Sequence, residues 1–111
     1  MRNSDAQILV IFVTTPSRRE AVRIGQAVVK KKLAACANIL SPVTSVFKWK
    51  GRIEKSREAL VIIKTTSRRY AALAKTIGSM HSYEVPEIIA VKVTRGLPRY
   101  IAWVRRETAI D

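Results

Sequence analysis

Three kinds of side chain in this sequence could support chemistry at a site. His81 is the single histidine and follows Met80, and an imidazole beside a thioether is a donor pair that copper(I) accepts. Adjacent residues at a helix end diverge in direction, so a histidine that bonds only to the backbone is the other interpretation. Glu84 and Glu87 flank Pro86, which places two carboxylates close together, but nothing else in the sequence supports acid–base catalysis by them.

The third kind is the thiol of Cys36, the single cysteine. It lies in an apolar segment, where a cysteine acts as a small buried hydrophobic residue. A reactive thiolate needs an accessible, electropositive setting, which the nearby Lys30, Lys31 and Lys32 could supply. One cysteine excludes an internal disulfide framework and fits a reducing compartment.

The composition is that of a globular protein with an unusual charge. The chain has 111 residues, of which 48% are hydrophobic and 26% charged, and we expect one domain over 1–111. The 21 Lys and Arg residues against 8 Asp and Glu give a formal net charge of +13. This charge attracts polyanions, so nonspecific binding to nucleic acid is one interpretation and simple solubility the other. The apolar runs are far shorter than the roughly 18 residues of a membrane helix, so we expect no membrane association.

The apolar periodicity predicts three helices and a set of short strands. Ser17 and Glu20 have the spacing of a capping box, so a helix should begin there and run over 18–33. Ser67 is expected to cap a second helix, and Pro98 suits the first turn of a third. The predicted strands cover 8–13, 36–40, 43–50, 52–54, 59–66 and 88–93, with a break at Ser41-Pro42 and a turn at Gly51.

This order, β-α-β-β-α-β with an extra C-terminal helix, is the plan of a ferredoxin-like α+β sandwich. Right-handed crossovers put two helices on one face of an antiparallel sheet, and the other face should then alternate apolar and polar residues. In the first strand, however, Phe12 points to one face while Ile11 and Val13 point to the other. We therefore expect a second copy of the chain to cover the additional apolar face. The alternative is that the C-terminal helix covers all of it.

Several stretches, in this order along the chain, resemble the CutA family of divalent-cation tolerance proteins. The most specific are the blocks Trp49-x-Gly51-x-Ile53-Glu54 and Tyr83-Glu84-Val85-Pro86-Glu87. The similarity extends from residue 8 to residue 105, and it includes LAACANI at 33–39, IKTT at 63–66 and YIAW at 100–103.

The resemblance implies a ferredoxin-like homotrimer whose long hairpin strands reach neighbouring subunits. It implies a cytoplasmic protein linked to tolerance of copper or another divalent cation, with no established reaction, so we expect no enzyme. The family's copper site would include His81, but the family cysteine late in the first strand is Val13 here. The residues that resemble those lining the family's clefts between subunits are Trp49, Lys64, Tyr83, Glu84 and Glu87. They could bind a small anionic ligand or instead lock the trimer.

Two other functions fit the same plan less well. A nucleic-acid-binding module would stack bases on exposed aromatic residues, but only 6% of the residues are aromatic. The basic residues are spread over loops and helices, which favours nonspecific binding. An acylphosphatase-like enzyme would need a phosphate-cradling loop after the first strand, and Thr15-Pro16-Ser17-Arg18 offers one arginine without a glycine-rich turn.

Overall fold

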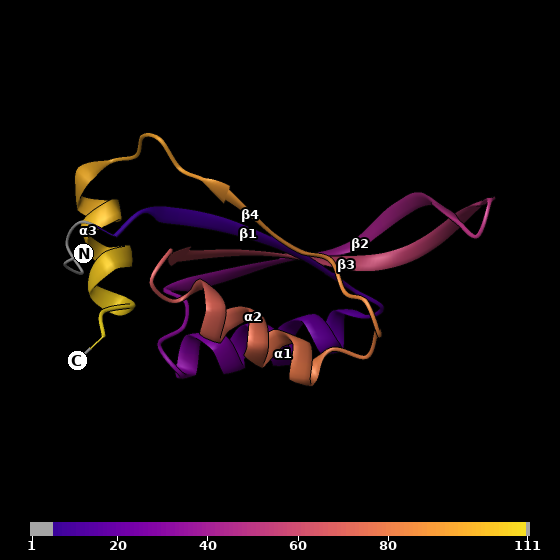
Figure 1. Cartoon of the computed structure of the whole chain (residues 1–111), viewed down its shortest axis with the longest axis horizontal. Coiled ribbons are helices and arrows are strands. Elements are labelled where there is room, and N and C mark those ends of the chain that lie inside the picture. The colour runs from indigo at the N-terminus through magenta and orange to yellow at the C-terminus, as the bar shows by residue number, and fades with distance from the viewer. Residues whose placement is uncertain (1–5, 111) are drawn as a thin grey trace.

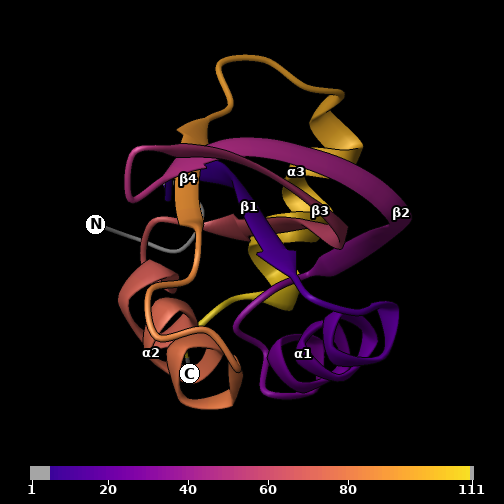
Figure 2. The same ribbon diagram turned by 90° about the vertical axis from the view of Figure 1, so that its right-hand side faces the viewer.

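A computed structural model of the chain describes residues 6–110. The four strands form one antiparallel sheet in the order β2-β3-β1-β4. Figures 1 and 2 show α1 and α2 together on one face of this sheet, and Figure 1 shows α3 at the end away from the tip of the β2–β3 hairpin. In chain order the elements are β1 Ile8–Thr15, α1 Arg18–Lys30, β2 Cys36–Trp49, β3 Arg52–Thr66, α2 Tyr70–Met80, β4 Ile88–Lys92 and α3 Pro98–Glu107.

The ferredoxin-like α+β fold with an extra C-terminal helix is therefore confirmed. The connections β1–α1–β2 and β3–α2–β4 are the two crossovers that the sequence predicts. The single domain expected over 1–111 includes residues 1–5 and 111, which lie outside the described part of the chain.

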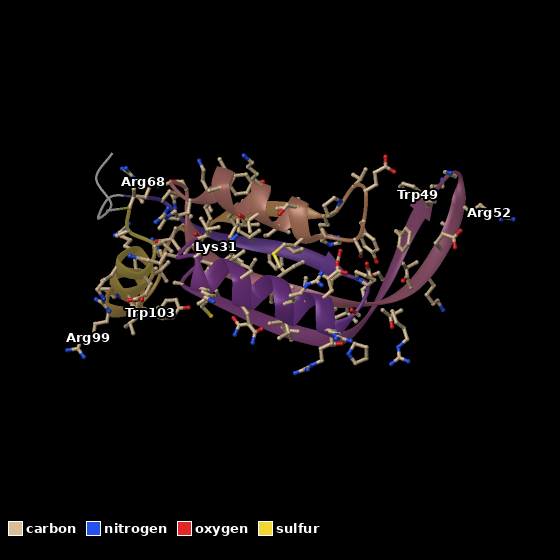
Figure 3. All side chains as sticks on the ribbon, turned by 90° about the horizontal axis from the view of Figure 1, so that it is seen from below. Lys31, Trp49, Arg52, Arg68, Arg99 and Trp103 are labelled. Carbon is tan, nitrogen blue, oxygen red and sulfur yellow. The ribbon has the colours of Figure 1, made fainter. Side chains whose placement is uncertain are left out.

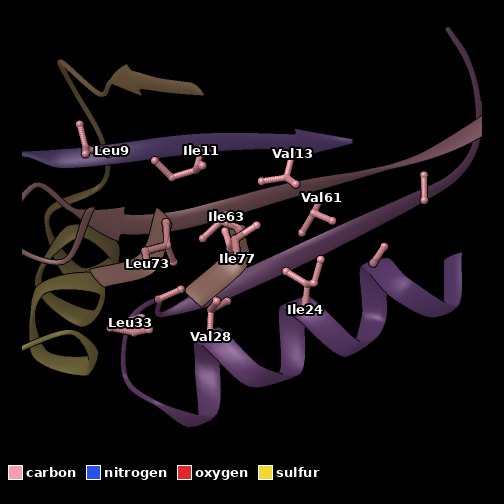
Figure 4. Packing of buried hydrophobic residues seen from close by; sticks show 13 residues of the cluster. Leu9, Ile11, Val13, Ile24, Val28, Leu33, Val61, Ile63, Leu73 and Ile77 are labelled. Atoms are coloured by element: carbon pink, nitrogen blue, oxygen red, sulfur yellow. The ribbon is translucent and has the colours of Figure 1, made fainter. Parts of the chain in front are cut away.

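The main core lies between the sheet and the two crossover helices (Figure 4). Branched side chains at every second position of β1 and β3 point to this face and pack against the apolar stripes of α1 and α2. The large members that are fully buried are Ile11, Val13, Ile24, Val28, Val61, Ile63, Leu73 and Ile77. Each such side chain stabilises the fold by about 1.5–3 kcal/mol, so this layer fixes the two helices and the loops that follow them.

Helix α1 begins where the sequence predicts but ends earlier. The Oγ of Ser17 accepts a hydrogen bond from the N–H of Glu20 at 3.2 Å, which confirms the N-cap. Glu20 does not complete a capping box, because its carboxylate accepts hydrogen bonds from Ser82 instead. The helix ends at Lys30, and Lys32 then adopts a left-handed backbone conformation with φ 61° that turns the chain toward β2.

Helix α2 begins at Tyr70, later than the predicted cap. The N–H of Ser67 donates to the carbonyl of Gln7 at 2.8 Å, and the N–H of Arg69 donates to the carbonyl of Thr66 at 3.0 Å. No side chain caps this helix. The prediction of Ser67 as the cap was wrong, because the segment after β3 first makes a turn that is bonded to the start of β1.

Strands β2 and β3 form one long hairpin rather than several short strands. β2 continues through Ser41-Pro42, and the pairing with β3 shifts register between Leu40 and Val43. The predicted break is therefore an irregularity within one strand. Gly51 turns the hairpin with φ 79°, a conformation that favours glycine. Figure 1 shows that the hairpin extends well beyond the helices.

The face of the sheet opposite α1 and α2, called the open face below, is apolar and only partly covered. Helix α3 covers one end of it through a small cluster that contains Ile8, Ala35 and Val104. Farther along β4, Ile89 is 52% exposed and Val91 is 50% exposed. The prediction of two apolar faces is confirmed, and the alternative that α3 covers the whole second face is wrong. The open face comprises Val10, Phe12, Leu40, Leu60, Ile62, Ile89 and Val91.

The chain exposes more surface than a compact monomer of its mass. Its radius of gyration is 14.7 Å, against about 13 Å for a compact chain of this length. Its accessible surface is 7387 Å², against roughly 6,200 Å² for a compact protein of 12.5 kDa. The molecule measures 45 × 25 × 22 Å, and an elongated shape of this kind has more surface than a sphere of the same mass.

Arginine side chains attach both ends of the described chain to its body through backbone carbonyls. Arg69 donates to the carbonyl oxygens of Thr108 and Ala109, just beyond α3, at 2.9 and 3.0 Å. The Nε of Arg105 donates to the carbonyl of Ala6 at 3.1 Å. These bonds fix the end of α3 and the segment that leads into β1.

Two helical glycines should respond in opposite ways to alanine. A Cβ at Gly25 would lie 3.2 Å from the Cβ of Ala37 in β2, so Gly25→Ala should destabilise the fold by about 1–3 kcal/mol through overpacking. A Cβ at Gly78 meets no atom within 4 Å, so Gly78→Ala should stabilise it by about 0.5–1 kcal/mol. Urea denaturation measures both changes, and equal values would contradict the close approach of α1 to β2.

Candidate functional site

His81 lies at the C-terminal end of α2, and the backbone engages both of its ring nitrogens. Nε2 lies 2.7 Å from the carbonyl oxygen of Thr14, which can only accept, so Nε2 carries the proton. Nδ1 accepts the N–H of Tyr83 at 3.0 Å, so Nδ1 is the bare nitrogen. The imidazole side chain is fully buried. The histidine that bonds to the backbone, one of the two interpretations of the sequence, is what the structure shows.

Glu20 and Arg23 of α1 hold the segment that follows α2. One carboxylate oxygen of Glu20 accepts hydrogen bonds from the N–H and the hydroxyl of Ser82, each at 3.1 Å, and lies 3.5 Å from Nδ1 of His81. One turn later, Arg23 donates to the carbonyl of Met80 at 3.3 Å. Sequence reasoning assigned Glu20 only to the helix cap and missed this role.

Tyr83 joins this segment to the hairpin. Its hydroxyl donates to Glu58 of β3 at 2.8 Å, and its ring centroid lies 4.9 Å from that of His81. Glu58 is buried, with 9% of its surface exposed. Burial, the bond to Glu58 and the negative charges of Glu58 and Glu20 raise the pKa of Tyr83 to about 12. The phenol therefore stays protonated at neutral pH and donates to a carboxylate.

The stability contributed by this phenol should depend on pH. The pKa of Tyr83 is about 12 in the folded chain and about 10 when unfolded, so its contribution is complete below pH 10 and is lost as pH rises through 12. Tyr83→Phe should lower the free energy of unfolding by about 1–3 kcal/mol at pH 8, and the difference should vanish above pH 12. Tyr70→Phe is the control, because the Tyr70 hydroxyl bonds to no described group. A constant difference between wild type and Tyr83→Phe from pH 8 to 12.5 would contradict the assignment.

The residues predicted to line a cleft do not come together within one chain. Trp49 lies at the tip of the hairpin and is 57% exposed (Figure 3). Lys64 lies at the far end of β3, opposite Cys36 in the ladder, and its ammonium donates to the amide oxygen of Asn38. Trp49 pairs with Arg52, which precedes Lys64 by twelve residues on β3, so the two are about 40 Å apart along the strand.

The remaining cleft candidates occupy a third place, the loop between α2 and β4. Tyr83 is half-buried, whereas Glu84 and Glu87 are exposed. One chain therefore presents the candidate residues at the hairpin tip, at the end of β3 and in this loop. A cleft that contains all of them needs more than one copy of the chain.

The residues of one chain do not fit a metal centre at His81. Within the described part of the chain, no group of three His, Cys, Asp or Glu side chains is placed to hold a metal ion. The chemistry of the donors agrees, because the lone pair of Nδ1 accepts the N–H of Tyr83 and Nε2 carries a proton directed at Thr14. The copper site that the family resemblance implies at His81 remains a prediction, and it would need donors from a second copy.

Cys36 is the first residue of β2, lies near Tyr100 of α3 and is half-buried. Its thiol interacts with the amide oxygen of Asn38 at 3.6 Å. Burial and the neighbouring Cys36 raise the pKa of Tyr100 in α3. The thiol thus lies beside a neutral amide and a phenol, close to the Lys64 ammonium that shares the same Asn38 oxygen.

Some of the basic side chains lie far from one another. Figure 3 shows Lys31, Arg52, Arg68 and Arg99 at separate places along the molecule. Charges spread in this way attract polyanions diffusely. Among the described helices, none is long and apolar enough to span a membrane.

Fold and site together define the class of this protein. It is a small ferredoxin-like α+β protein with a projecting hairpin and an open apolar sheet face. A sequence model described as the CutA1 divalent ion tolerance protein matches residues 9–107. The chain belongs to this family, which confirms the resemblance seen in the sequence.

Individual relatives support the same assignment. The chain is 46% identical over 97 residues to protein CutA of Mus musculus, covering 87% of this chain and 55% of the mouse protein. It is 43% identical over 94 residues to the divalent-cation tolerance protein CutA of Archaeoglobus fulgidus, covering 85% of this chain and 91% of that protein. The crystal structure of CutA1 from Oryza sativa matches with a TM-score of 0.92 at 32% identity, covering 97% of this chain and 99% of that one. The chain thus spans about half the length of the mouse relative.

Proposed function

We propose that the protein is a divalent-cation tolerance protein of the cytoplasm that works as a homotrimer, binds its ligand in clefts between subunits and catalyses no reaction. The observation that carries this proposal is the open face. Ile89 and Val91 are half exposed on the edge strand β4, beside the apolar side chains of β1 on the same face, a state that water disfavours. Copies of the same chain, each one domain over 1–111, would cover this surface without any other partner.

The hairpin gives a second, independent reason for assembly. Its outer part exposes four large apolar side chains, namely Val46, Phe47, Trp49 and Ile53. A hairpin that reaches a neighbouring copy would bury them. It would also bring Trp49 toward Lys64 or the α2–β4 loop of another copy, which resolves the separation of about 40 Å within one chain.

The completed cleft would combine an indole, an ammonium, a phenol and two carboxylates. Such a mixture suits a small polar or anionic ligand, with the aromatic rings supplying contact area and the charged groups orientation. The tolerance function would also involve copper or another divalent cation at His81, with further donors from a second copy, since one chain lacks a ligand set.

Analytical ultracentrifugation tests the assembly. We expect one species with three times the mass of the chain at micromolar concentration. A well-folded single chain under these conditions would overturn the homotrimer and the clefts built from it.

Copper(I) titration followed by amide NMR tests the metal site. An ion that binds the imidazole must disturb the bond between Nδ1 and the N–H of Tyr83, so the Tyr83 amide signal should shift with saturation. Saturable binding that leaves this signal in place would remove His81 as a ligand while leaving the trimer unaffected. Met80→Leu is the matched variant, because it removes the neighbouring thioether and keeps the imidazole.

A further inference from the structure

A cavity of about 390 Å³ lies between the start of β1, the loop after β4 and α3. Ile8, Val93 and Ile101 give it an apolar wall, and Arg95 and Arg105 border it with two guanidinium groups. None of the described residues that line it is acidic. We propose that this cavity, called the α3 pocket below, binds a small organic phosphate monoester, with the phosphate on the arginines and the apolar part on the wall.

Arg105 is already positioned for such a ligand. Its Nε donates to the carbonyl of Ala6 at 3.1 Å, which holds the partly buried side chain in place. This bond uses only Nε, so the two terminal amino groups of the guanidinium are available to a ligand. The planar edge of a guanidinium binds a phosphate through two parallel hydrogen bonds. Because the side chain is ordered before binding, the ligand loses less of its interaction energy to side-chain ordering.

The loop that carries Arg95 is anchored where it leaves β4. The N–H of Val93 donates to the carbonyl of Ile8 at 3.0 Å, and the side-chain amide of Gln7 donates to the carbonyl of Val93 at 2.9 Å. Within the described part of the chain, the N–H groups of Arg95 and Gly96 have no backbone acceptor. These two N–H groups are exposed beside the Arg95 guanidinium and are donors that a bound anion can use in place of water.

Gly96 lets this loop lie directly against α3. A Cβ at Gly96 would lie 2.6 Å from Cδ1 of Ile101, a distance that forces a shift of the isoleucine. The glycine therefore permits the close approach that places Arg95, on the loop, and Arg105, on α3, around one cavity.

Charge selects a phosphate monoester over a carboxylate. A monoester carries nearly two negative charges at pH 7 and three acceptor oxygens, which match two guanidinium groups, whereas a carboxylate carries one charge and two oxygens. The α3 pocket shares no residue with the cleft candidates, so its ligand is separate from the one proposed for the cleft.

Isothermal titration calorimetry of the assembled protein with phenyl phosphate tests the proposal. We expect saturable binding with one site per chain, and Arg95→Gln or Arg105→Gln should each weaken it at least tenfold. Arg99→Gln removes the same charge from an exposed position on α3 outside the pocket, and it should change the affinity less than twofold. Benzoate, which keeps the ring and replaces the phosphate, should bind at least tenfold more weakly than phenyl phosphate.

Three results would overturn the α3 pocket as a phosphate site: no saturable binding to wild type, an equal loss in Arg99→Gln, or equal affinity for benzoate. Arg95 is exposed on a loop, so Arg95→Gln gives a folded protein even where the loss of the Ala6 bond unfolds Arg105→Gln. None of these outcomes decides whether the protein is a homotrimer. That question is answered by the sedimentation of the wild-type protein, which does not depend on Arg95 or Arg105.

Discussion

Replacing Ile89 with lysine should separate the assembled protein into single chains that stay folded. In an isolated chain the side chain at this position is half exposed on β4, so an ammonium there remains in water. In an assembly that covers the open face, the ammonium would be buried opposite Phe12 of β1, an apolar side chain that cannot pair with it. An unpaired buried charge costs about 3 kcal/mol or more, which weakens each association step more than a hundredfold.

Val29→Lys is the matched control for this experiment. Val29 lies on α1, on the helical side of the molecule, and is 40% exposed, so the same change in charge and volume occurs away from the open face. Sedimentation velocity measures assembly, and circular dichroism measures folding. An Ile89→Lys protein that sediments like wild type would show that the open face does not mediate assembly.

Truncating His81 to alanine should lower the free energy of unfolding by about 3–5 kcal/mol. The change leaves the carbonyl of Thr14 and the N–H of Tyr83 without their partner inside the protein, and each unpaired buried group costs about 1–3 kcal/mol. The cavity left by the imidazole adds to this loss. Guanidinium chloride denaturation at pH 7 measures the effect.

Two further variants separate the causes of this loss. His81→Asn retains an acceptor near the N–H of Tyr83 and gives up the bond to Thr14, so about half of the loss should return. Ser79→Ala, on the exposed side of the same helix, should change stability by less than about 0.5 kcal/mol. If His81→Ala costs no more than Ser79→Ala, the two imidazole bonds do not stabilise the fold.

The stability of His81→Ala also affects the test of the copper site. A strongly destabilised variant would lose copper binding whether or not His81 is a ligand, so the Tyr83 amide signal is the better reporter.

The parts of the fold that depend on local pattern could be predicted from the sequence. The continuous apolar run of β1 predicts a strand, and the spacing of apolar residues in α1 predicts an amphipathic helix; each signal is contained within a short stretch of sequence. The cap of α2 could not be predicted in the same way. Ser67 has the right residue type, but its N–H is bonded to the carbonyl of Gln7 just before β1, and that contact depends on the pairing of β1 with β3.

The candidate site shows the same limit. Glu20 has a local explanation as a capping residue, and its actual partner, Ser82, is 62 residues away. Glu58 lies between two predicted strand segments, where no periodic signal marks it as buried, and its bond to Tyr83 forms only when the hairpin passes the α2–β4 loop. The cleft candidates came from family resemblance, and one chain separates them because the hairpin is long.

The arginine–carbonyl bonds of this protein have a consequence for its behaviour in salt. Between described side chains, an ion pair forms only at the exposed Arg106–Glu107, whereas Arg69 and Arg105 anchor the chain ends to uncharged carbonyl oxygens. Dissolved ions screen exposed charges of both signs. Because the formal net charge is +13, repulsions between cationic side chains greatly outnumber attractions between cations and carboxylates. Screening therefore removes more repulsion than attraction. Raising the ionic strength should therefore stabilise both the fold and the association of its copies.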